Sequence, residues 1–276
     1  MLNFDYKKLC DEINDLKNMY PFLEVTCEGK SINNRCIFCI TFGNGDKEVL
    51  INGAHHGLEW ITSPLLTQFL RDCCDSYTQG KRYKGYDMRE IYNNIKLYIM
   101  PMINPDGVDI VINQGKRWQA NARGVDLNHN YNARWDLAQK LERENGIVGP
   151  RWSRYGGPAP ESEPETRAVT DFVRQHNIQR LIALHTQGEE IYYSFEGLEP
   201  PQSLSIALQM AAKSGYTVSR PESLASYGGC KDWFISEYRR PGFTIEAGRG
   251  TNPLPIEMFD EIYQKLSAIL LVGIDM

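Results

Sequence analysis

The sequence predicts an α/β protein with a mostly parallel, mixed β-sheet and helices on both faces. Strand-like apolar runs alternate with segments of helical spacing along the 276 residues, and this alternation is typical of such sheets. Three of the runs stop at a glycine or a polar residue, as buried strands do: 49–53, 181–185 and 242–246. A hydrophobic content of 42% allows a large core, so we expect one domain over residues 1–276.

The first hundred residues are expected to hold two helices and four strands. Apolar residues at helical spacing predict an amphipathic helix over 4–19, and they are Tyr6, Leu9, Ile13 and Leu16. A second helix is expected over 64–77, with Ser63 as its N-cap and Pro64 at its first helical position. The strands are expected near 22–28, 34–41, 47–53 and 95–102.

The rest of the chain begins with a long segment over 113–165. This segment is rich in Asn, Gly, Pro and Arg, and such a composition predicts a long functional loop. A helix from Glu163 to Gln175 is then expected to lead into the strand that ends at His185. Helices near 201–214 and 255–272 are expected to complete the domain.

The charge and hydropathy of the chain argue against nucleic-acid and membrane partners. The net charge is −5 and the pI is about 5.6, so no basic patch for nucleic acid or an anionic membrane is expected. No apolar run approaches the roughly 20 residues of a transmembrane helix, and the first ten residues lack the apolar segment of a signal peptide. A cytoplasmic location is therefore expected. Nothing in the sequence indicates an oligomeric state.

The seven cysteines are an odd number, which fits a reducing compartment. Cys36 and Cys39 form a C-x-x-C pattern, but it lies in a strand-like run where positions three apart face opposite sides. We therefore expect neither metal binding nor redox chemistry there. Cys73 and Cys74 lie in the expected second helix and are interpreted as core residues.

Four residues at the ends of apolar runs are the candidates for chemistry. His56 and Glu59 lie on one strand-to-helix turn, where open α/β sheets place their sites, and His185 and Glu246 end two later runs. Two histidines and one glutamate leave the fourth position of a tetrahedral zinc ion open, as in catalytic sites. Each residue also has an ordinary interpretation: a chance pair, a core histidine, or a surface carboxylate at a strand end.

Four motifs follow one another in a fixed order, and together they resemble the M14 zinc carboxypeptidase family over most of the chain. They are G-A-H-H-G-L-E-W at 53–60, N-P-D-G at 104–107, R-G-V-D-L-N at 123–128, and F-T-I-E at 243–246 after the distal histidine. The resemblance implies that His56, Glu59 and His185 bind one Zn²⁺ ion. It also implies that Glu246 is the general base and acid.

Several positions depart from the family pattern at the substrate site. His129 stands where family members usually carry the arginine that holds the C-terminal α-carboxylate, and histidine cannot form that bidentate fork. Leu58 and Gln119 replace two further arginines of the family pattern. The arginine usually found at the position of Gln119 supports the oxyanion. Removal of the last residue from an ordinary peptide, the reaction of a conventional carboxypeptidase, is therefore disfavoured. Arg117 and Arg123 are the candidates to replace the missing oxyanion arginine, and His129 either binds substrate or fills the arginine's space.

Other segments resemble the bacterial branch of the family that hydrolyses γ-D-glutamyl-diamino acid bonds in murein peptides. They are G-G-P-A-P-E-S-E-P-E-T-R at 156–167 and G-R-G-T-N-P-L-P at 248–255. The segment from Tyr227 to Trp233 resembles the family's specificity-pocket segment, with Lys231 at the base of the pocket. A lysine there would favour a carboxylate on the leaving group, as in meso-diaminopimelate, although Lys231 could equally be a solvated surface residue.

The sequence therefore predicts a zinc metallopeptidase whose partner is a small murein peptide. The expected substrate-binding residues are Gln119, Arg123, Asn128, His129, Tyr227 and Lys231. The alternatives are a carboxypeptidase for ordinary peptides and a zinc hydrolase for N-acyl amino acids. A non-catalytic binding module is disfavoured, because such a protein has no need of the base Glu246.

Overall fold

A mixed sheet of eight strands forms the centre of the chain in the computed structural model, which describes residues 4–220 and 227–276. The strands follow the order β1-β2-β6-β3-β7-β10-β8-β9. Strands β6, β3, β7 and β10 run parallel, whereas β1 and β2 continue the sheet antiparallel on one side. On the other side, β8 is antiparallel to β10 and β9 is parallel to β8. The predicted fold class is confirmed.

Six of the eight strands of the sheet were predicted, and their bounds agree with the predicted runs to within a few residues. The eight strands are β1 (Glu24–Lys30), β2 (Cys36–Phe42), β3 (Lys47–Gly53), β6 (Ile95–Met100), β7 (Ile178–His185), β8 (Glu190–Tyr192), β9 (Thr217–Ser219) and β10 (Gly242–Glu246). Strands β4 (Arg82–Tyr83) and β5 (Tyr86–Asp87) form a separate small hairpin. Strands β4, β5, β8 and β9 were not predicted, and each has only two or three residues, too few for a periodic pattern.

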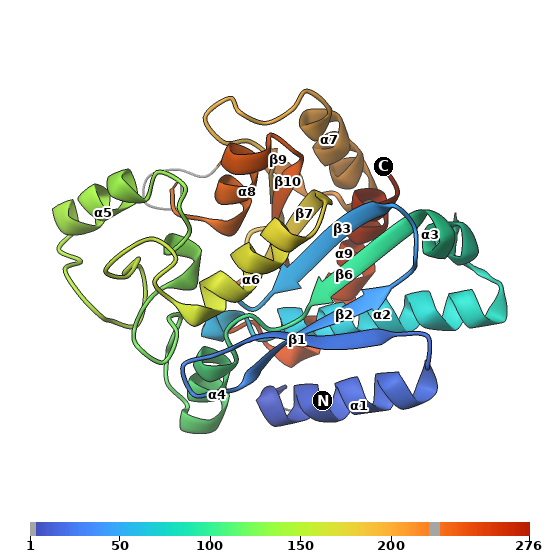
Figure 1. Cartoon of the computed structure of the whole chain (residues 1–276), viewed down its shortest axis with the longest axis horizontal. Coiled ribbons are helices and arrows are strands. Elements are labelled where there is room, and N and C mark those ends of the chain that lie inside the picture. The colour runs from blue at the N-terminus through green and yellow to red at the C-terminus, as the bar shows by residue number, and fades with distance from the viewer. Residues whose placement is uncertain (1–3, 221–226) are drawn as a thin grey trace.

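Helices cover both faces of the sheet (Figure 1). Helices α1 (Tyr6–Met19), α2 (Thr62–Gln79), α7 (Gln202–Ser214) and α9 (Phe259–Asp275) contribute to one core cluster, together with alternate strand residues such as Ile51 and Ile182. Helices α6 (Pro164–Gln175) and α8 (Cys230–Tyr238) contribute to a second cluster with the intervening residues, such as Leu50 and Leu181. Strands buried on both faces explain the continuous apolar runs in the sequence.

Helix α2 begins at Thr62, two residues before the predicted start, and Ser63 is not its N-cap. The Ser63 hydroxyl instead donates to the Pro101 carbonyl at 2.7 Å. The Thr62 hydroxyl donates to the Glu59 carbonyl and accepts from the Ala54 amide, both at 2.8 Å. Thr62 therefore links the end of β3 to the start of the helix, and this link extends the helix toward the site.

The segment 113–165 is more ordered than predicted. Helix α5 (Trp135–Glu144) and the short helix η2 (Leu127–His129) lie within it. Helices α3 (Met88–Asn94), α4 (Pro105–Gln114) and α8 were also missed, as was the short helix η1 (Gly57–Glu59). The short helix η4 (Ile256–Met258) lies within the helix predicted near 255–272. These helices are short, and several bury only two or three side chains, so they leave a weak helical pattern in the sequence.

The expectation of reduced cysteines does not hold for one pair. Cys27 of β1 and Cys36 of β2 form a disulfide, and their Cα atoms are 5.6 Å apart across the antiparallel ladder. Cys39 remains a free thiol in the second core cluster. Cys73 and Cys74 are free and fully buried in α2, as predicted.

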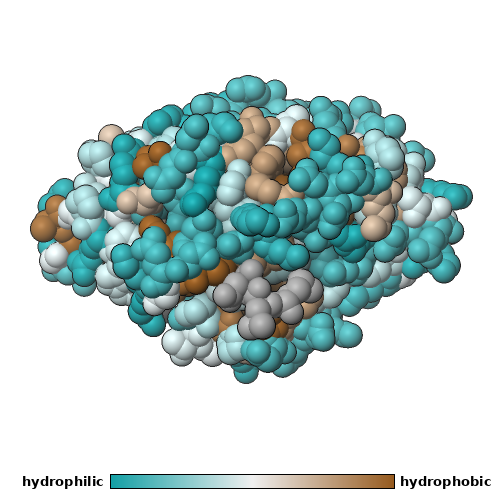
Figure 2. All heavy atoms as spheres, turned by 90° about the horizontal axis from the view of Figure 1, so that it is seen from below, coloured by the Kyte–Doolittle hydropathy of each residue, from teal (hydrophilic) through white to brown (hydrophobic). Residues whose placement is uncertain are grey.

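Hydrophilic residues dominate the face that Figure 2 shows, and hydrophobic residues appear there in scattered groups. Within residues 4–220 and 227–276, no helix combines the length and the apolar character needed to span a bilayer. The apolar residues of the sequence are instead used in the two clusters that enclose the sheet.

Candidate metal centre and active site

The ends of three neighbouring parallel strands bring the candidate residues together. His56 and Glu59 follow β3, His185 is the last residue of β7, and Glu246 is the last residue of β10. Because β3, β7 and β10 are adjacent and parallel, their carboxyl ends lie at one edge of the sheet. Ligand sites of open α/β sheets are found at this edge.

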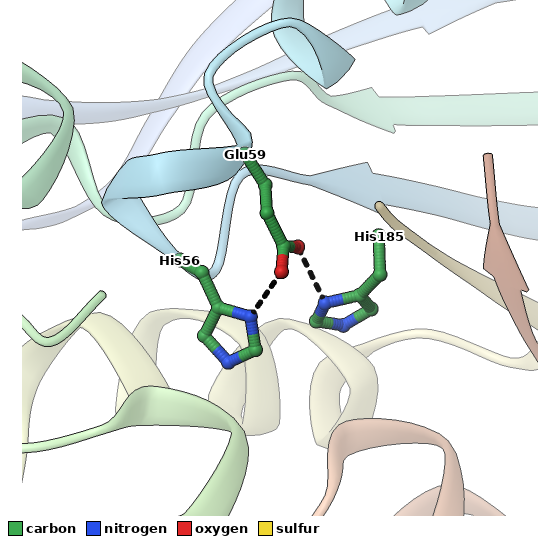
Figure 3. Close-up of side chains that lie close together, drawn as sticks. All are labelled: His56, Glu59 and His185. Atoms are coloured by element: carbon green, nitrogen blue, oxygen red, sulfur yellow. Dashed lines mark hydrogen bonds and ion pairs between the residues drawn. The ribbon is translucent and has the colours of Figure 1, made fainter. Parts of the chain in front are cut away.

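The Glu59 carboxylate lies between two imidazole rings (Figure 3). Its Oε1 atom is 2.7 Å from His56 Nδ1, and its Oε2 atom is 2.9 Å from His185 Nδ1. The candidate ligand atoms of the three residues all lie within 4.8 Å of one another. All three side chains are buried. Burial alone would raise the pKa of Glu59, but the two imidazoles together lower it to about 2.

Asp126 contacts the side of the His56 ring that faces away from Glu59. Its Oδ1 atom is 3.1 Å from His56 Nε2, which leaves His56 Nδ1 directed toward Glu59. Its Oδ2 atom accepts from Gln119 Nε2 at 3.1 Å and from the Arg154 amide at 2.8 Å. Burial raises the pKa of Asp126, but His56, His129 and the Arg154 amide more than offset that effect and keep its pKa well below the usual range. A carboxylate on the far nitrogen of a ligand histidine orients the ring and raises its basicity.

The N-P-D-G motif at 104–107 is hydrogen-bonded to the turn that carries His56. Asn104 caps α4, where its Oδ1 atom accepts from the Gly107 amide at 2.8 Å. Its Nδ2 atom donates to the carbonyls of His55 and Ala120, both at 3.0 Å. Gly57 approaches so closely that an added Cβ would lie 2.4 Å from the Gly107 carbonyl oxygen. The turn that carries His56 therefore has a fixed position on α4.

One pocket contains the three metal-site residues, Glu246 and four of the predicted substrate-binding residues. Those four are Gln119, Asn128, His129 and Lys231. The remaining lining residues are Arg154, Thr186, Gln187, Tyr192, Gly229, Asp232, Thr244 and Asn252. Tyr227 borders an adjoining cavity that shares Asp232 with this pocket. The structure thus brings together most of the predicted site.

Arg123 does not reach the pocket. Its guanidinium pairs with Glu163 at 2.9 Å, and half of its side chain is exposed. Arg117 lies with its guanidinium carbon 5.3 Å from the centre of the Trp152 ring, in an exposed position. Neither candidate therefore replaces the missing oxyanion arginine in this structure. Both arginines were candidates because they lie close to Gln119 in the sequence. Their partners in the structure, Glu163 and Trp152, are distant in the sequence.

Lys231 is buried at the pocket wall and is not a solvated surface residue, because only 2% of it is exposed. Its Nζ atom donates to the Ser194 carbonyl at 2.8 Å and to the Asp232 carboxylate. Burial raises the pKa of Asp232, and the Lys231 charge opposes that effect. An ammonium group has three donors, so one remains for a ligand in the pocket.

His129 lines the pocket and faces helix α5 behind it. Its Nδ1 atom is 3.4 Å from Glu142 Oε1. Asn128, next to it in η2, accepts from the Cys230 amide at 2.9 Å through its Oδ1 atom. These contacts join η2 to α5 and to the start of α8, which carries Lys231. The unpredicted helix α5 is thus part of the support of the site.

Glu246 lies at the pocket with its pKa well above the ordinary value. Burial is the main cause, and the Glu59 carboxylate nearby adds to it. A carboxyl group whose pKa is raised holds a proton more readily, and this suits it to accept and return a proton during a reaction. A cation held by Glu59 would offset the second of these causes and help Glu246 to ionise.

Sequence reasoning missed eight of the residues that line the pocket, and three of them bear on its chemistry: Asp232, Asn252 and Arg154. Asp232 adjoins a residue that was singled out, and Asn252 lies in the 248–255 segment that carried the resemblance. Asn252 donates to the Thr186 carbonyl at 2.7 Å, which holds it beside the metal-site residues. Arg154 had no signal of its own, because it enters the pocket from the middle of the long segment between α5 and α6.

The three metal-site residues fit a zinc ion. They offer two imidazole nitrogens and one carboxylate that converge on one point, and such a donor set leaves a fourth position for water or substrate. The orientation of His56 by Asp126 is also typical of zinc sites. An α/β sheet with this donor set and the half-buried carboxyl group of Glu246 at the same edge defines a metallohydrolase.

Comparisons with known proteins agree with this class. A sequence model of the zinc carboxypeptidase family (Peptidase_M14) matches residues 9–267. This chain belongs to that family and is a zinc metallopeptidase.

Two relatives span nearly the whole chain. Gamma-D-glutamyl-L-diamino acid endopeptidase 1 of Lysinibacillus sphaericus is 40% identical, over 99% of this chain and 72% of its own length. The uncharacterized protein YqgT of Bacillus subtilis (strain 168) is 32% identical, over 97% of this chain and 76% of its own length.

Solved structures share the fold at lower identity. The crystal structure of thrombin activatable fibrinolysis inhibitor superposes with a TM-score of 0.82 at 20% identity, covering 98% of this chain and 73% of that chain. The crystal structure of murein-tripeptide amidase MpaA from Escherichia coli O157 gives a TM-score of 0.60 at 20% identity, covering 90% of this chain and 91% of that chain.

Proposed function

We propose that this enzyme hydrolyses the amide bond between γ-linked D-glutamate and diaminopimelate in small murein peptides, with one zinc ion held by His56, Glu59 and His185. The observation that carries the proposal is the buried lysine Lys231 in the pocket wall, next to the candidate metal site. The identity of 40% with a relative named as a γ-D-glutamyl-diamino acid endopeptidase supports it independently.

The leaving group in this proposal carries two charges at its far end. Diaminopimelate has an α-carboxylate and an α-ammonium group there, and both would need partners in a buried pocket. Lys231 has one donor left after its bonds to Ser194 and Asp232, and this donor would bind the carboxylate. Asp232 would accept from the ammonium group. The pair therefore matches a zwitterion better than an apolar or aromatic side chain.

The groups at the metal site suit hydrolysis of an amide. A zinc ion bound there would lower the pKa of water from about 16 to about 7 and polarise the amide carbonyl. Glu246 would accept the proton of the attacking water and donate it to the leaving amine. Asp126 and Asn104 would keep His56 in position throughout, since neither side chain is free to move away from its partners.

Mass spectrometry of the zinc-loaded enzyme with two peptides tests the proposal. The peptides are L-Ala-γ-D-Glu-meso-diaminopimelate and an ordinary peptide with a C-terminal aromatic residue. We expect release of diaminopimelate from the first and no change in the second, with the Glu246→Gln variant as the control for contaminating peptidases.

The other outcomes have defined meanings. Trimming of the aromatic peptide would favour an ordinary carboxypeptidase in spite of the missing arginines. Cleavage of neither peptide by a zinc-loaded enzyme would contradict the proposal and favour a hydrolase of N-acyl amino acids.

A further inference from the structure

The pocket contains a second cationic side chain besides Lys231, that of Arg154. Arg154 lies in none of the sequence motifs and is not one of the candidate metal ligands. Arg154 lines the pocket with Glu246 and the three candidate metal ligands. Within residues 4–220 and 227–276, its guanidinium forms no hydrogen bond or ion pair. It is close enough to Glu246 for its charge to favour the ionised carboxylate, against the larger effect of burial. A half-buried guanidinium without a protein partner in a substrate pocket is a candidate to bind an anion.

The backbone around Arg154 is held in place by the metal-site segment. The amides of Gln119 and Ala120 donate to the Trp152 carbonyl at 2.8 and 3.0 Å. The Asp126 amide donates to the Tyr155 carbonyl at 2.7 Å, and the Arg154 amide donates to Asp126 Oδ2 at 2.8 Å. Asp126 also binds His56, so a single residue connects the position of Arg154 to a candidate zinc ligand.

The same region shows a conformation that ordinary loops rarely adopt. Arg154 has a φ of 71°, in the left-handed region, where a residue other than glycine is uncommon. The flanking hydrogen bonds hold it there. Gln119 stands where the family usually has an arginine, and its side chain is already bound to Asp126. Arg154 is therefore the cation that this chain brings to the His56 side of the pocket.

The two cations of the pocket differ in position and in their partners. Lys231 belongs to α8 and is paired with Asp232, whereas Arg154 belongs to the segment bound to Asp126 and is unpaired among the described residues. If Lys231 and Asp232 hold the leaving group, as the proposed function has it, the acyl part of the substrate extends to the other side of the metal site. A group that Arg154 could bind would then belong to the acyl residue.

We propose that Arg154 binds the free α-carboxylate of the γ-linked D-glutamate and so selects the γ-linkage. An α-linked residue has no free carboxylate on its main chain at this point, because that carboxyl group forms the scissile amide itself. A γ-linked D-glutamate keeps its α-carboxylate a short methylene chain away from the reacting carbonyl. The planar guanidinium of arginine can bind it with two parallel hydrogen bonds. This inference rests on the proposed function.

Two substrates that differ only at that carboxylate test the inference. They are L-Ala-γ-D-Glu-meso-diaminopimelate and its α-carboxamide, in which D-isoglutamine replaces D-glutamate. We expect Arg154→Met to lower kcat/KM for the carboxylate substrate by about 10- to 100-fold, the usual effect of losing a hydrogen bond between charged groups. The same variant should change kcat/KM for the carboxamide by less than about threefold.

Matched variants and a binding measurement complete the design. Arg151→Met removes an exposed positive charge from the same segment and should leave both substrates unaffected. Arg154→Lys retains the charge and should recover part of the activity on the carboxylate substrate. Calorimetry on the zinc-loaded Glu246→Gln variant, with and without Arg154→Met, should show weaker binding of the carboxylate peptide alone.

Each other outcome overturns a specific statement. An equal loss of kcat/KM on both substrates would mean that Arg154 acts on the reacting carbonyl oxygen and does not distinguish the γ-linkage. No loss on either substrate would remove Arg154 from substrate binding. If the wild-type enzyme cleaves neither peptide, the proposed function fails and the assignment of Arg154 fails with it. If the wild type cleaves them and Arg154→Met has equal effects, only the assignment of Arg154 fails.

Discussion

Glu246 lies directly opposite His185 where strand β10 pairs with strand β7. Both are the last residues of their strands, and in parallel register their side chains leave the same face of the sheet. The proposed proton acceptor and a candidate zinc ligand are therefore fixed to two neighbouring strands, not to loops. Their separation is set by the spacing of neighbouring strands in the sheet.

Replacing Glu246 with Gln removes the proposed proton acceptor and keeps the shape of the side chain. We expect kcat to fall by at least about 100-fold, because general acid-base catalysis usually contributes 10²- to 10⁴-fold. Zinc content should stay at the wild-type level, since Glu246 is not among the candidate ligands. Steady-state kinetics and elemental analysis of the same preparation measure both. A variant with near-normal kcat would rule out Glu246 as the base.

Replacing His185 with Ala should remove one of the three zinc ligands. We expect purified His185→Ala protein to contain much less zinc than the wild type after dialysis against a low concentration of chelator. His176→Ala is the matched control, because His176 packs on Phe172 and is not one of the candidate zinc ligands. Full zinc occupancy in His185→Ala would remove His185 from the ligand set.

Replacing Asp126 with Asn tests the support of His56. Loss of a carboxylate that orients a ligand histidine usually weakens metal binding by about 10- to 100-fold. We expect a shift of this size in a competition titration with a zinc-binding dye. Asp136→Asn is the control, since the Asp136 side chain is 82% exposed and lies in the same long segment. An unchanged zinc affinity would show that the backbone alone positions His56.

The sequence predicts the strands at the site well because they are buried on both faces. Strands β3 and β7 appear as continuous apolar runs. His185 is the last residue of β7, and His56 follows three residues after the end of β3. His56, Glu59, His185 and Glu246 could therefore be located from the sequence, and the structure brings them together.

The surroundings of the site were less predictable, because they depend on contacts between distant parts of the chain. Arg123 was expected near the substrate, but Glu163, forty positions away, holds it outside the pocket. Arg154 enters the pocket because Asp126, twenty-eight positions away, binds its amide. Neither contact can be predicted from local sequence patterns. Helix α5 was missed for a related reason, since it buries only Ala138, Gln139 and Glu142.

Replacing Lys231 with Met should change the specificity of the enzyme more than its rate. We expect KM for diaminopimelate peptides to rise by about tenfold or more, because the buried charge that would bind the leaving-group carboxylate is lost. Peptides with a neutral leaving group should show a smaller change. Lys213→Met, at an exposed position of α7, is the control. Equal changes in KM for both kinds of peptide would contradict the role of Lys231.

Replacing Glu165 with Gln should flatten the dependence of stability on pH. Burial raises the pKa of Glu165 from 4.5 to about 7, although its carboxylate accepts from the Ile32 amide at 3.0 Å and from Asn121 at 3.2 Å. The folded protein therefore binds more protons than the unfolded chain between these two pH values. By linkage, the contribution of Glu165 to the free energy of unfolding is greatest below pH 4.5 and is lost as the pH rises to about 7.

The size of this effect makes it measurable by chemical denaturation. The shift in pKa corresponds to a change on the order of 3 kcal/mol in the free energy of unfolding across that window. Glu165→Gln should lose most of this pH dependence, because glutamine keeps an acceptor for the Ile32 amide and does not titrate. Glu237→Gln, at an exposed position of α8, should leave the wild-type profile unchanged. If Glu165→Gln retains the full decline in stability between pH 4.5 and 7, other groups must cause that decline.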